Sequence, residues 1–247
     1  MITTRRRVRH KVSLARALSK FGFTSRSKAR TLIEDGKVRV NNRTVRSPEF
    51  RVDLRADRLS VKDKPIRAHR HIYLALNKPV GVVTTKSDEL GRTTVYEFLP
   101  KISGWLFPIG RLDKDTSGLL LVTNDTRFGE KVTSPLGRIQ KKYTVRLGAP
   151  LRDSDRVRME ETVTLVDGTT LLPSVVRVSG SDPSVCTITI SEGKNRQIRR
   201  MCEHFGYTVL ELCRLSIGPI RLGRLREGAT RPLTPDEVSA ILSFAGE

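Results

Sequence analysis

Residues 110–125 have the sequence GRLDKDTSGLLLVTND, and this stretch decides how the larger part of the chain folds. The apolar run at 119–122 has the length and flanks of a strand buried on both faces, so we expect a strand over 119–123. Asp113 lies just before this run, near Arg111 and Asp115. A charge beside a buried strand is costly unless it is paired or used, so Asp113 needs a physical explanation.

Two non-catalytic interpretations of Asp113 compete with a catalytic one. Asp113, Asp115, Ser117 and Gly118 match the opening positions of an EF-hand calcium loop. The twelfth position is Asn124, which cannot supply a bidentate carboxylate, and a strand rather than a helix follows, so this interpretation fails. The second is a turn in which Asp and Ser side chains bond to the backbone, which is the commoner role of a lone Asp.

The composition excludes several classes of protein. The chain has 247 residues, of which 37% are hydrophobic, enough for one large domain or for a large and a small one. It has no apolar run that could span a membrane, and its first residues lack the apolar core of a secretory signal. Three cysteines without a C-x-x-C pair predict reduced thiols in the cytoplasm, and four histidines show no metal-ligand spacing.

The positive charge is concentrated at the N-terminal end. Residues 1–70 hold 21 Lys and Arg against 6 Asp and Glu, a net charge of +15, whereas residues 71–247 hold 25 against 20, a net charge of +5. Solubility alone would not concentrate charge in this way, but a module that binds a polyanion would. We expect residues 1–12 to be a basic arm and no segment to bind membranes.

Residues 13–45 show the pattern of two short helices and a hairpin. Apolar residues at helical spacing predict the two helices, with Ser13 and Ser25 at their starts and Gly22 and Gly36 at their ends. VRVNNRTV at 38–45 alternates around two asparagines, which is a hairpin signal. Polar side chains of the second helix and the hairpin would form a surface for RNA phosphates, namely Arg26, Lys28, Arg30, Lys37, Arg39 and Asn41.

The core TSRSKARTLIEDGKVRVNN, together with the later VKDKPI, resembles the S4-like RNA-binding domain of ribosomal proteins and RNA-modifying enzymes. The resemblance spans residues 13–66 and implies binding of structured RNA. Residues 67–72, with His69, Arg70 and His71, are predicted to be a linker.

Residues 73–247 are predicted to form a larger α+β domain with a mixed, mainly antiparallel sheet. Alternating or apolar segments predict its strands: two in IYLALNKPVGVVTT, then 119–123, KKYTVRL, an Asp-Gly hairpin in 162–178, CTITISEG and TVLELCRLSIGPI. Helices are predicted in NRQIRRMCEHFGY, with Ile198, Met201, Cys202 and Phe205 on one face, and in PLTPDEVSAILSF.

Four motifs follow the S4-like segment in a fixed order: LNKPVGVVTT, GRLDKDTSGLLLVTND, KKYTVRL and EGKNRQIRRMCEHFGY. Together they resemble the bacterial ribosomal-RNA pseudouridine synthases, in the branch that includes the small-subunit enzyme, from about residue 13 to about 220. The resemblance implies isomerisation of a uridine within RNA to pseudouridine. It also implies that no metal or cofactor is needed, which agrees with the missing metal spacing and phosphate loop.

The resemblance assigns three catalytic positions. Asp113 matches the essential carboxylate, which acts either as nucleophile at the ribose or as base at the neighbouring ribose carbon; the sequence leaves both routes open. Tyr143 matches the tyrosine that stacks on the target uracil. Arg199 matches the basic residue that pairs with the carboxylate and keeps it ionised.

Five further positions are expected to contact the substrate. Arg111 matches the arginine that fills the space of the extruded base, and Ile198 matches the aliphatic residue that packs under the tyrosine. Lys78, Lys194 and Arg196 are expected to contact the RNA backbone.

The expected partner is ribosomal RNA or a ribosome-assembly intermediate, bound by a monomer. The wording of 195–207 favours large-subunit 23S over small-subunit 16S RNA, with action on a tRNA as an alternative. A different class of function, a noncatalytic RNA-binding or assembly factor, would keep only the S4-like module, and the intact Asp113, Tyr143 and Arg199 argue against it.

Overall fold

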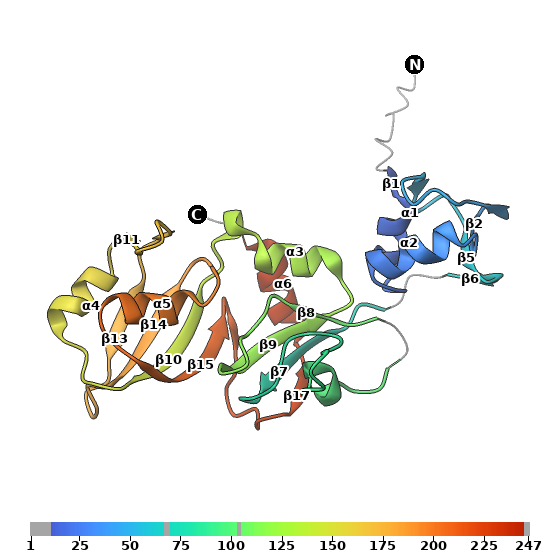
Figure 1. Ribbon diagram of the computed structural model, residues 1–247. Helices are drawn as coiled ribbons and strands as arrows, with labels where there is room; N and C mark the ends of the chain where they lie inside the picture. The colour runs from blue at the N-terminus through green and yellow to red at the C-terminus, as the bar shows by residue number, and fades with distance from the viewer. Residues whose placement is uncertain (1–10, 67–69, 103–104, 245–247) are drawn as a thin grey trace, which may run out of the picture. The chain divides into compact units, whose positions relative to one another are not determined.

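The computed structural model describes residues 11–66, 70–102 and 105–244 (Figure 1). The chain forms two compact units. The N-terminal unit comprises Met1–Ile72, Ile102–Phe107 and Asn124–Thr126, and the C-terminal unit comprises the rest. Most of the basic arm expected at 1–12, and half of the linker expected at 67–72, lie outside the described residues.

The two helices expected near the N-terminus are present as α1 (Leu14–Lys20) and α2 (Arg26–Glu34). The Ser25 hydroxyl accepts a hydrogen bond from the Lys28 amide at 3.3 Å, which caps α2 as expected. Ser13 occupies the N-cap position of α1 without a side-chain cap bond. Gly22 and Gly36 follow the two helices with φ of +67° and +71°, a conformation that glycine adopts without strain.

Two hairpins complete the module. Their strands are β2 (Val38–Val40), β3 (Arg43–Thr44), β5 (Leu59–Val61) and β6 (Lys64–Pro65), in the order β3-β2-β5-β6. Asn41 and Asn42 have φ of 50° and 66°, as the expected turn requires. The turn between β5 and β6 has the same left-handed geometry at Lys62 and Asp63 but carries no such sequence signal.

A further pair of strands, β1 (Lys11–Ser13) and β4 (Arg51–Asp53), lies next to the helices. The core beneath these elements is small and aliphatic. Its fully buried members are Leu14, Ala17, Leu18, Ala29, Ile33, Val38 and Val52.

Within the described residues, the C-terminal unit is built on a nine-stranded sheet. Its path is β13-β14-β10-β15-β9-β7-β17, with β16 beside β15 and β8 beside β9. The bounds are β7 (Tyr73–Lys78), β8 (Phe107–Ile109), β9 (Ser117–Thr123), β10 (Lys141–Leu147), β13 (Val175–Val178), β14 (Val185–Ile190), β15 (Val209–Ile217), β16 (Ile220–Arg221) and β17 (Thr230–Pro232). β9 and β15 pair parallel, whereas β10 pairs antiparallel with both β14 and β15, so the predicted mixed sheet is confirmed.

Strand β9 is the strand expected from the opening stretch, and it is buried on both faces. Leu119 and Leu121 pack with helices α3 (Thr126–Thr133) and α6 (Pro235–Ser243). Leu120 points to the opposite face and joins a core that includes helix α5 (Gln197–His204). Burial on both faces explains why the sequence of β9 is continuously apolar rather than alternating.

Helix α5 covers the sheet beside β10 and β14 (Figure 1). Ile198, Met201 and Cys202 are buried, and Phe205 packs partly buried against the same core, as the helical spacing predicted. The NRQIRRM segment thus lies near β10, the strand that carries Tyr143, and residues of both line one pocket.

Several elements differ from the sequence expectations. VVTT at 82–85 forms no strand; Val83 makes only an isolated bridge to Thr94. The hairpin around Asp167-Gly168 is confirmed as β11 (Val163–Thr164) and β12 (Thr170–Leu171). The helices α3 and α4 (Asp153–Met159), and the 3-10 turns η1 (Val95–Phe98) and η2 (Pro135–Gly137), were not predicted, because each offers only one or two turns of periodic pattern.

Candidate active site

Asp113 lies in the loop between β8 and β9, in the turn that precedes β9 rather than at the strand end itself. The Asp113 carbonyl accepts a hydrogen bond from the Thr116 amide at 3.1 Å. The Thr84 hydroxyl donates to the Leu112 carbonyl at 2.8 Å and accepts from the Leu112 amide at 3.3 Å. These bonds fix the backbone on both sides of Asp113, while its side chain stays partly exposed.

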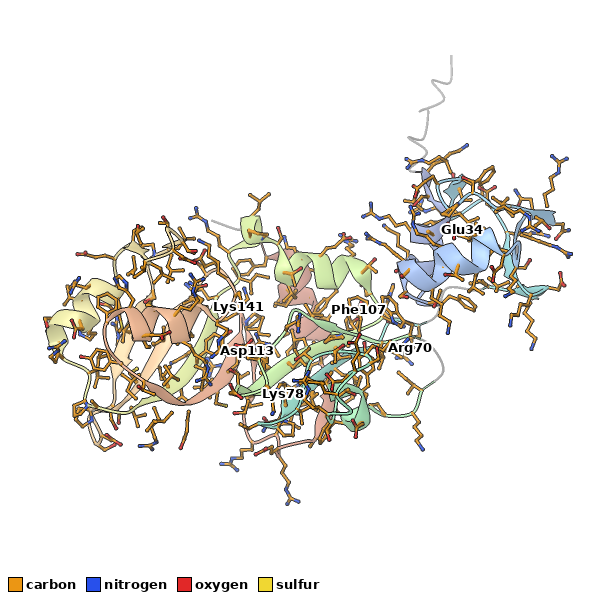
Figure 2. All side chains as sticks on the ribbon, viewed as in Figure 1. Glu34, Arg70, Lys78, Phe107, Asp113 and Lys141 are labelled. Carbon is orange, nitrogen blue, oxygen red and sulfur yellow. The ribbon has the colours of Figure 1, made fainter. Side chains whose placement is uncertain are left out.

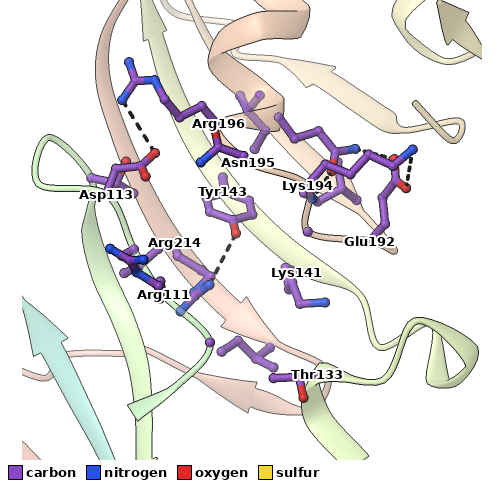
Figure 3. Close-up of a pocket in the computed structure, with 18 of the residues that line it drawn as sticks. Arg111, Asp113, Thr133, Lys141, Tyr143, Glu192, Lys194, Asn195, Arg196 and Arg214 are labelled. Atoms are coloured by element: carbon purple, nitrogen blue, oxygen red, sulfur yellow. Dashed lines mark hydrogen bonds and ion pairs between the residues drawn. The ribbon is translucent and has the colours of Figure 1, made fainter. Parts of the chain in front are cut away.

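A cavity of about 650 Å³ opens beside this loop (Figure 3). It is bounded by the loop before β9, by β10 and β15, and by the segment that enters α5. Seven of the side chains that line it matter for the chemistry: Arg111, Asp113, Tyr143, Lys194, Arg196, Ile198 and Arg214. The structure therefore brings together six of the eight residues expected at the site.

The ion pair of Asp113 involves a different arginine from the one expected. Among the described residues, the cation beside Asp113 is Arg196, whose Nη1 lies 3.7 Å from Asp113 Oδ2 and 3.9 Å from Asp115 Oδ2. Arg196 adopts φ of +48° at the N-cap of α5. This left-handed turn is invisible to helical spacing, which extends the helix through Arg196 and places it on another side.

Arg199 makes no ion pair with Asp113, so the expected pairing is wrong in this structure. Its Nη2 donates to the Asp115 carbonyl at 2.9 Å, and its Nη1 donates to the Val209 carbonyl at 3.0 Å. Arg199 thus ties the backbone of the Asp113 loop to the start of β15. Its contribution is to hold the loop, and Arg196 supplies the nearby charge.

Tyr143 lies on β10 with its ring buried in the cavity wall. Its hydroxyl accepts a hydrogen bond from Nη1 of Arg214 at 3.4 Å, and the Arg214 guanidinium lies 6.0 Å from the ring centroid. Ile198, from α5, lines the same cavity. Arg214 was not among the expected residues, although one signal was available: it is a charged residue at an inward position of an alternating strand.

Lys78 cannot contact the RNA backbone as expected, because its side chain is fully buried. Its ammonium donates to the carbonyls of Pro79 at 2.7 Å and Thr116 at 2.8 Å. Burial lowers the pKa of Lys78 from 10.5 to about 8, and the nearby carboxylates of Asp113 and Asp115 oppose this shift. Lys78 therefore supports the Asp113 loop through the Thr116 carbonyl. The apolar residues that precede it on β7 did not predict that the strand ends at a buried amine.

Lys194 lies in the cavity wall, but its ammonium is engaged by the protein. It donates to the Thr170 carbonyl and lies 3.3 Å from the carboxylate of Glu192. The Glu192 carboxylate also accepts a hydrogen bond from the Gln197 amide at 2.8 Å. These contacts fix the segment that leads into α5. Lys194 therefore orders the rim of the cavity in addition to contributing a positive charge.

Arg111 is exposed and lines the cavity on the Asp113 side (Figure 3). Another cation of the wall, Lys141, was not expected. Burial lowers the pKa of Lys141, and the positive charge of Arg214 lowers it further. The cavity is therefore lined by more cations than carboxylates, the two carboxylates being Asp113 and Glu192.

In the N-terminal unit, the expected basic residues are exposed. Figure 2 shows many long side chains around this unit that project away from the ribbon. Three of them form surface ion pairs: Arg30 with Glu49, Lys37 with Asp35, and Arg39 with Asp63. Asn41 differs from the others. Its amide donates to Asp57 at 2.9 Å and its oxygen accepts from the Arg58 amide at 2.9 Å, so it holds the hairpin turn instead of facing a ligand.

Residues 11–66, 70–102 and 105–244 contain no group of three His, Cys, Asp or Glu side chains that could hold a metal ion. In the same ranges no helix is long and apolar enough to cross a membrane.

Comparison with known proteins agrees with this geometry. Residues 72–204 match the RNA pseudouridylate synthase family, and residues 13–59 match the S4 domain. The chain belongs to the RNA pseudouridylate synthase family and is an RNA pseudouridine synthase with an N-terminal S4 domain.

Individual relatives match along nearly the whole chain. Ribosomal large subunit pseudouridine synthase B of Bacillus subtilis (strain 168) is 36% identical over 94% of this chain and 96% of its own length. An uncharacterized RNA pseudouridine synthase of Aquifex aeolicus (strain VF5) is 34% identical over 95% of both chains. A solved structure titled as a pseudouridylate synthase has a TM-score of 0.70 and 31% identity, covering 93% of this chain and 99% of that one.

Proposed function

We propose that this enzyme converts a specific uridine of large-subunit (23S) ribosomal RNA to pseudouridine, with Asp113 as the essential carboxylate. One observation carries the proposal: Asp113 is held at the edge of a cavity of about 650 Å³, which has room for a uracil and whose wall contains Tyr143, with a cation 3.7 Å from its carboxylate. The choice of large-subunit RNA is supported by the name of a relative that is 36% identical over nearly the full chain.

The chemistry follows from the residues of the cavity. Asp113 either attacks the ribose carbon that holds the base or removes a proton from the neighbouring ribose carbon, and both routes need an ionised carboxylate close to the sugar. Arg196 places a positive charge 3.7 Å from that carboxylate. Tyr143 and Ile198 offer the flat and apolar surfaces against which a detached uracil can turn.

The remaining residues bind or position. Arg111, exposed beside Asp113, fills the space that an extruded uridine leaves in folded RNA. Arg199 and Lys78 hold the Asp113 loop through the carbonyls of Asp115 and Thr116. Lys194 orders the rim of the cavity.

The N-terminal module docks the enzyme on its substrate. Its exposed Arg26, Lys28, Arg30, Lys37 and Arg39 neutralise phosphates, which gives affinity without reading sequence. The substrate is free ribosomal RNA or a ribosome-assembly intermediate, the enzyme acts as a monomer, and it works in the cytoplasm, where its thiols stay reduced.

Two alternatives differ in substrate or in class. In the first, the substrate is a tRNA. The cavity contacts only the flipped nucleotide, so it does not by itself select between a tRNA and ribosomal RNA. A noncatalytic assembly factor would need only the RNA-binding module. The supported carboxylate loop argues against this second alternative, because Lys78 and Arg199 position a carboxylate that such a factor would not use.

The experiment is to incubate the purified enzyme with 23S transcripts, 16S transcripts and tRNA, and to map pseudouridine at nucleotide resolution. We expect one modified position, in 23S RNA, and its loss in cells that lack the gene. Modification of tRNA alone would replace the proposed substrate. Absence of pseudouridine in every RNA, with tight RNA binding retained, would favour the noncatalytic alternative.

A further inference from the structure

Arg214 is the most deeply buried arginine of the cavity wall, with 4% of its surface exposed. Its Nε donates to the Leu119 carbonyl at 2.7 Å, which fixes the guanidinium between β15 and β9. Its Nη1 donates to the Tyr143 hydroxyl at 3.4 Å. Its Nη2 is buried and has no hydrogen-bond partner among the described residues.

An unpartnered donor of this kind is costly. A buried polar group without a hydrogen bond destabilises a fold by about 1–3 kcal/mol, and more when it is charged. Such a group persists when something outside the resting protein satisfies it. Since Arg214 lines the cavity, the partner of Nη2 is to be sought in the bound substrate.

A second donor lies beside it. Because a guanidinium can only donate, the Tyr143 hydroxyl accepts from Arg214 and keeps its own proton for another acceptor. No acceptor for that proton is present among the described residues. Nη2 of Arg214 and the hydroxyl of Tyr143 are thus two neighbouring donors on one wall of the cavity (Figure 3).

We propose that Arg214, together with the Tyr143 hydroxyl, binds a carbonyl oxygen of the target uracil and stabilises the negative charge that the base carries when it leaves the ribose. This assignment rests on the proposed pseudouridine synthesis and deepens it. Fixed donors aimed at developing charge are a strong source of catalysis in a cavity that excludes water.

The step balances without any further reactant. The bond between the ribose carbon and N1 breaks, its electron pair stays on the base, and the negative charge spreads over N1 and the two carbonyl oxygens. While the base turns, the ribose carbon is either an ester of Asp113, whose carbon–oxygen bond breaks when C5 attacks, or part of a double bond to the neighbouring carbon, which regains its proton from Asp113. C5 then bonds to the ribose carbon, the C5 hydrogen leaves as a proton, and N1 gains a proton. Arg214 takes part in these steps only as a hydrogen-bond donor.

The charges around Arg214 agree with this role. Lys141 projects into the same cavity, and its pKa is lowered first by burial and then by the charge of Arg214. Lys78 lies beside the Asp113 loop, where it donates to the Thr116 carbonyl. This positive charge would stabilise a transient uracil anion, in addition to attracting the phosphates of the RNA.

The test uses RNA substrates whose target uridine is replaced by 2-thiouridine or 4-thiouridine, since sulfur is a poorer acceptor than oxygen. Single-turnover rates at saturating RNA are measured for the full-length wild type and for Arg214→Gln, Arg214→Lys and Tyr143→Phe. Arg146→Gln is the matched control, because Arg146 lies on β10, outside the residues that line the cavity, and pairs with Asp182.

We expect Arg214→Gln to turn over about 10²-fold more slowly, with RNA affinity little changed, and Arg214→Lys to recover part of the rate. The wild type should discriminate against one thio substrate, which identifies the bound oxygen, and Arg214→Gln should discriminate less. If the variants do not fold, as melting curves would show, wild-type discrimination alone decides.

Three results separate the possible failures. Equal wild-type rates on the uridine and both thio substrates would overturn the role of Arg214, as would a fully active Arg214→Gln. Loss of discrimination in Arg146→Gln would show an effect of charge in general and would likewise overturn it. A wild type that forms no pseudouridine in any RNA would instead refute the proposed function itself.

Discussion

The N-terminal unit and the cavity of the C-terminal unit are both rich in arginine, but they hold it in different ways. In the N-terminal unit the basic side chains are exposed and pair with carboxylates across the surface, as Arg30 does with Glu49. Around the cavity, Arg199 and Arg214 are fixed by backbone carbonyls, and Arg214 is almost fully buried. Exposed pairs contribute little energy and are screened by salt, whereas a fixed, buried guanidinium positions atoms.

This difference predicts that changes in the two regions have separable effects. Changes to the exposed cations should alter RNA affinity and its salt dependence. Changes to the fixed cations, or to the strands that hold them, should alter folding or turnover.

The largest effect is expected from Gly118→Ala, at the point where β9 meets β15. Gly118 has φ of +98°, and a Cβ there would lie 2.4 Å from the Arg214 carbonyl oxygen. Because backbone on both sides would have to move, we expect a loss of stability of about 3 kcal/mol or more, or no folded protein. Urea unfolding measures it. Gly180→Ala, where nothing lies within 4 Å of the added Cβ, is the control and should be nearly neutral.

The next effect concerns Lys78 and depends on pH. The pKa of Lys78 is about 8 in the folded protein and 10.5 when exposed, so the unfolded chain binds more protons between these values. Stability from this group therefore rises with pH from about 8 to 10.5, by about 3 kcal/mol in total. We expect the unfolding free energy of the wild type to rise relative to that of Lys78→Met as the pH increases across this window. Parallel curves for the two proteins would show that the amine is not buried as described.

Turnover should distinguish the three arginines of the α5 segment. Arg199→Ala removes the guanidinium that donates to the carbonyls of Asp115 and Val209 and so ties the Asp113 loop to β15. We expect turnover to fall about 10²-fold. Arg196→Ala removes a half-exposed ion pair and should slow turnover about tenfold. The factor should be smaller at high salt, because salt screens the pair in the wild type. Arg200, which bonds to Asp167 and Thr169, is the control. Single-turnover rates at saturating RNA decide, and a loss in Arg200→Ala equal to that in Arg199→Ala would contradict the distinction.

The smallest effect per residue is expected in the N-terminal unit. Replacing Arg26, Lys28 and Arg39 by Gln should weaken RNA binding and leave turnover at saturating RNA unchanged. Each lost phosphate contact should reduce the slope of log affinity against log salt by about 0.9, or about 0.7 on single strands. Filter binding at several salt concentrations measures it. An unchanged slope would mean that this surface does not dock the RNA.

The same two regions show how much of the structure the sequence could predict. The N-terminal module depends on contacts between neighbours in sequence: the Ser25 cap, the glycines after both helices and the Asn41-Asn42 turn were all predictable. The strands β9 and β10 were predictable from their patterns as well. Fold class and family followed from these local signals together with the order of the motifs.

The partners within the cavity could not be predicted in the same way, because they depend on long-range geometry. The family resemblance suggested Arg199 as the partner of Asp113, but the left-handed backbone of Arg196 turns that residue toward the carboxylate instead. Lys78 lies beside Thr116 only because β7 pairs with β9. Arg214 lies behind Tyr143 because β15 pairs with β10, with a register shift next to Tyr143.

The central claim is that the Asp113 carboxylate performs the chemistry in a cavity that is otherwise built to bind. Asp113→Asn keeps the shape and size of the side chain and removes the charge. The decisive measurement is pseudouridine formation by the purified, folded Asp113→Asn enzyme on the RNA that the wild type modifies, with Asp115→Asn as the matched control in the same loop. We predict that Asp113→Asn binds this RNA but forms no pseudouridine, while Asp115→Asn remains active; appreciable product from Asp113→Asn would contradict the account.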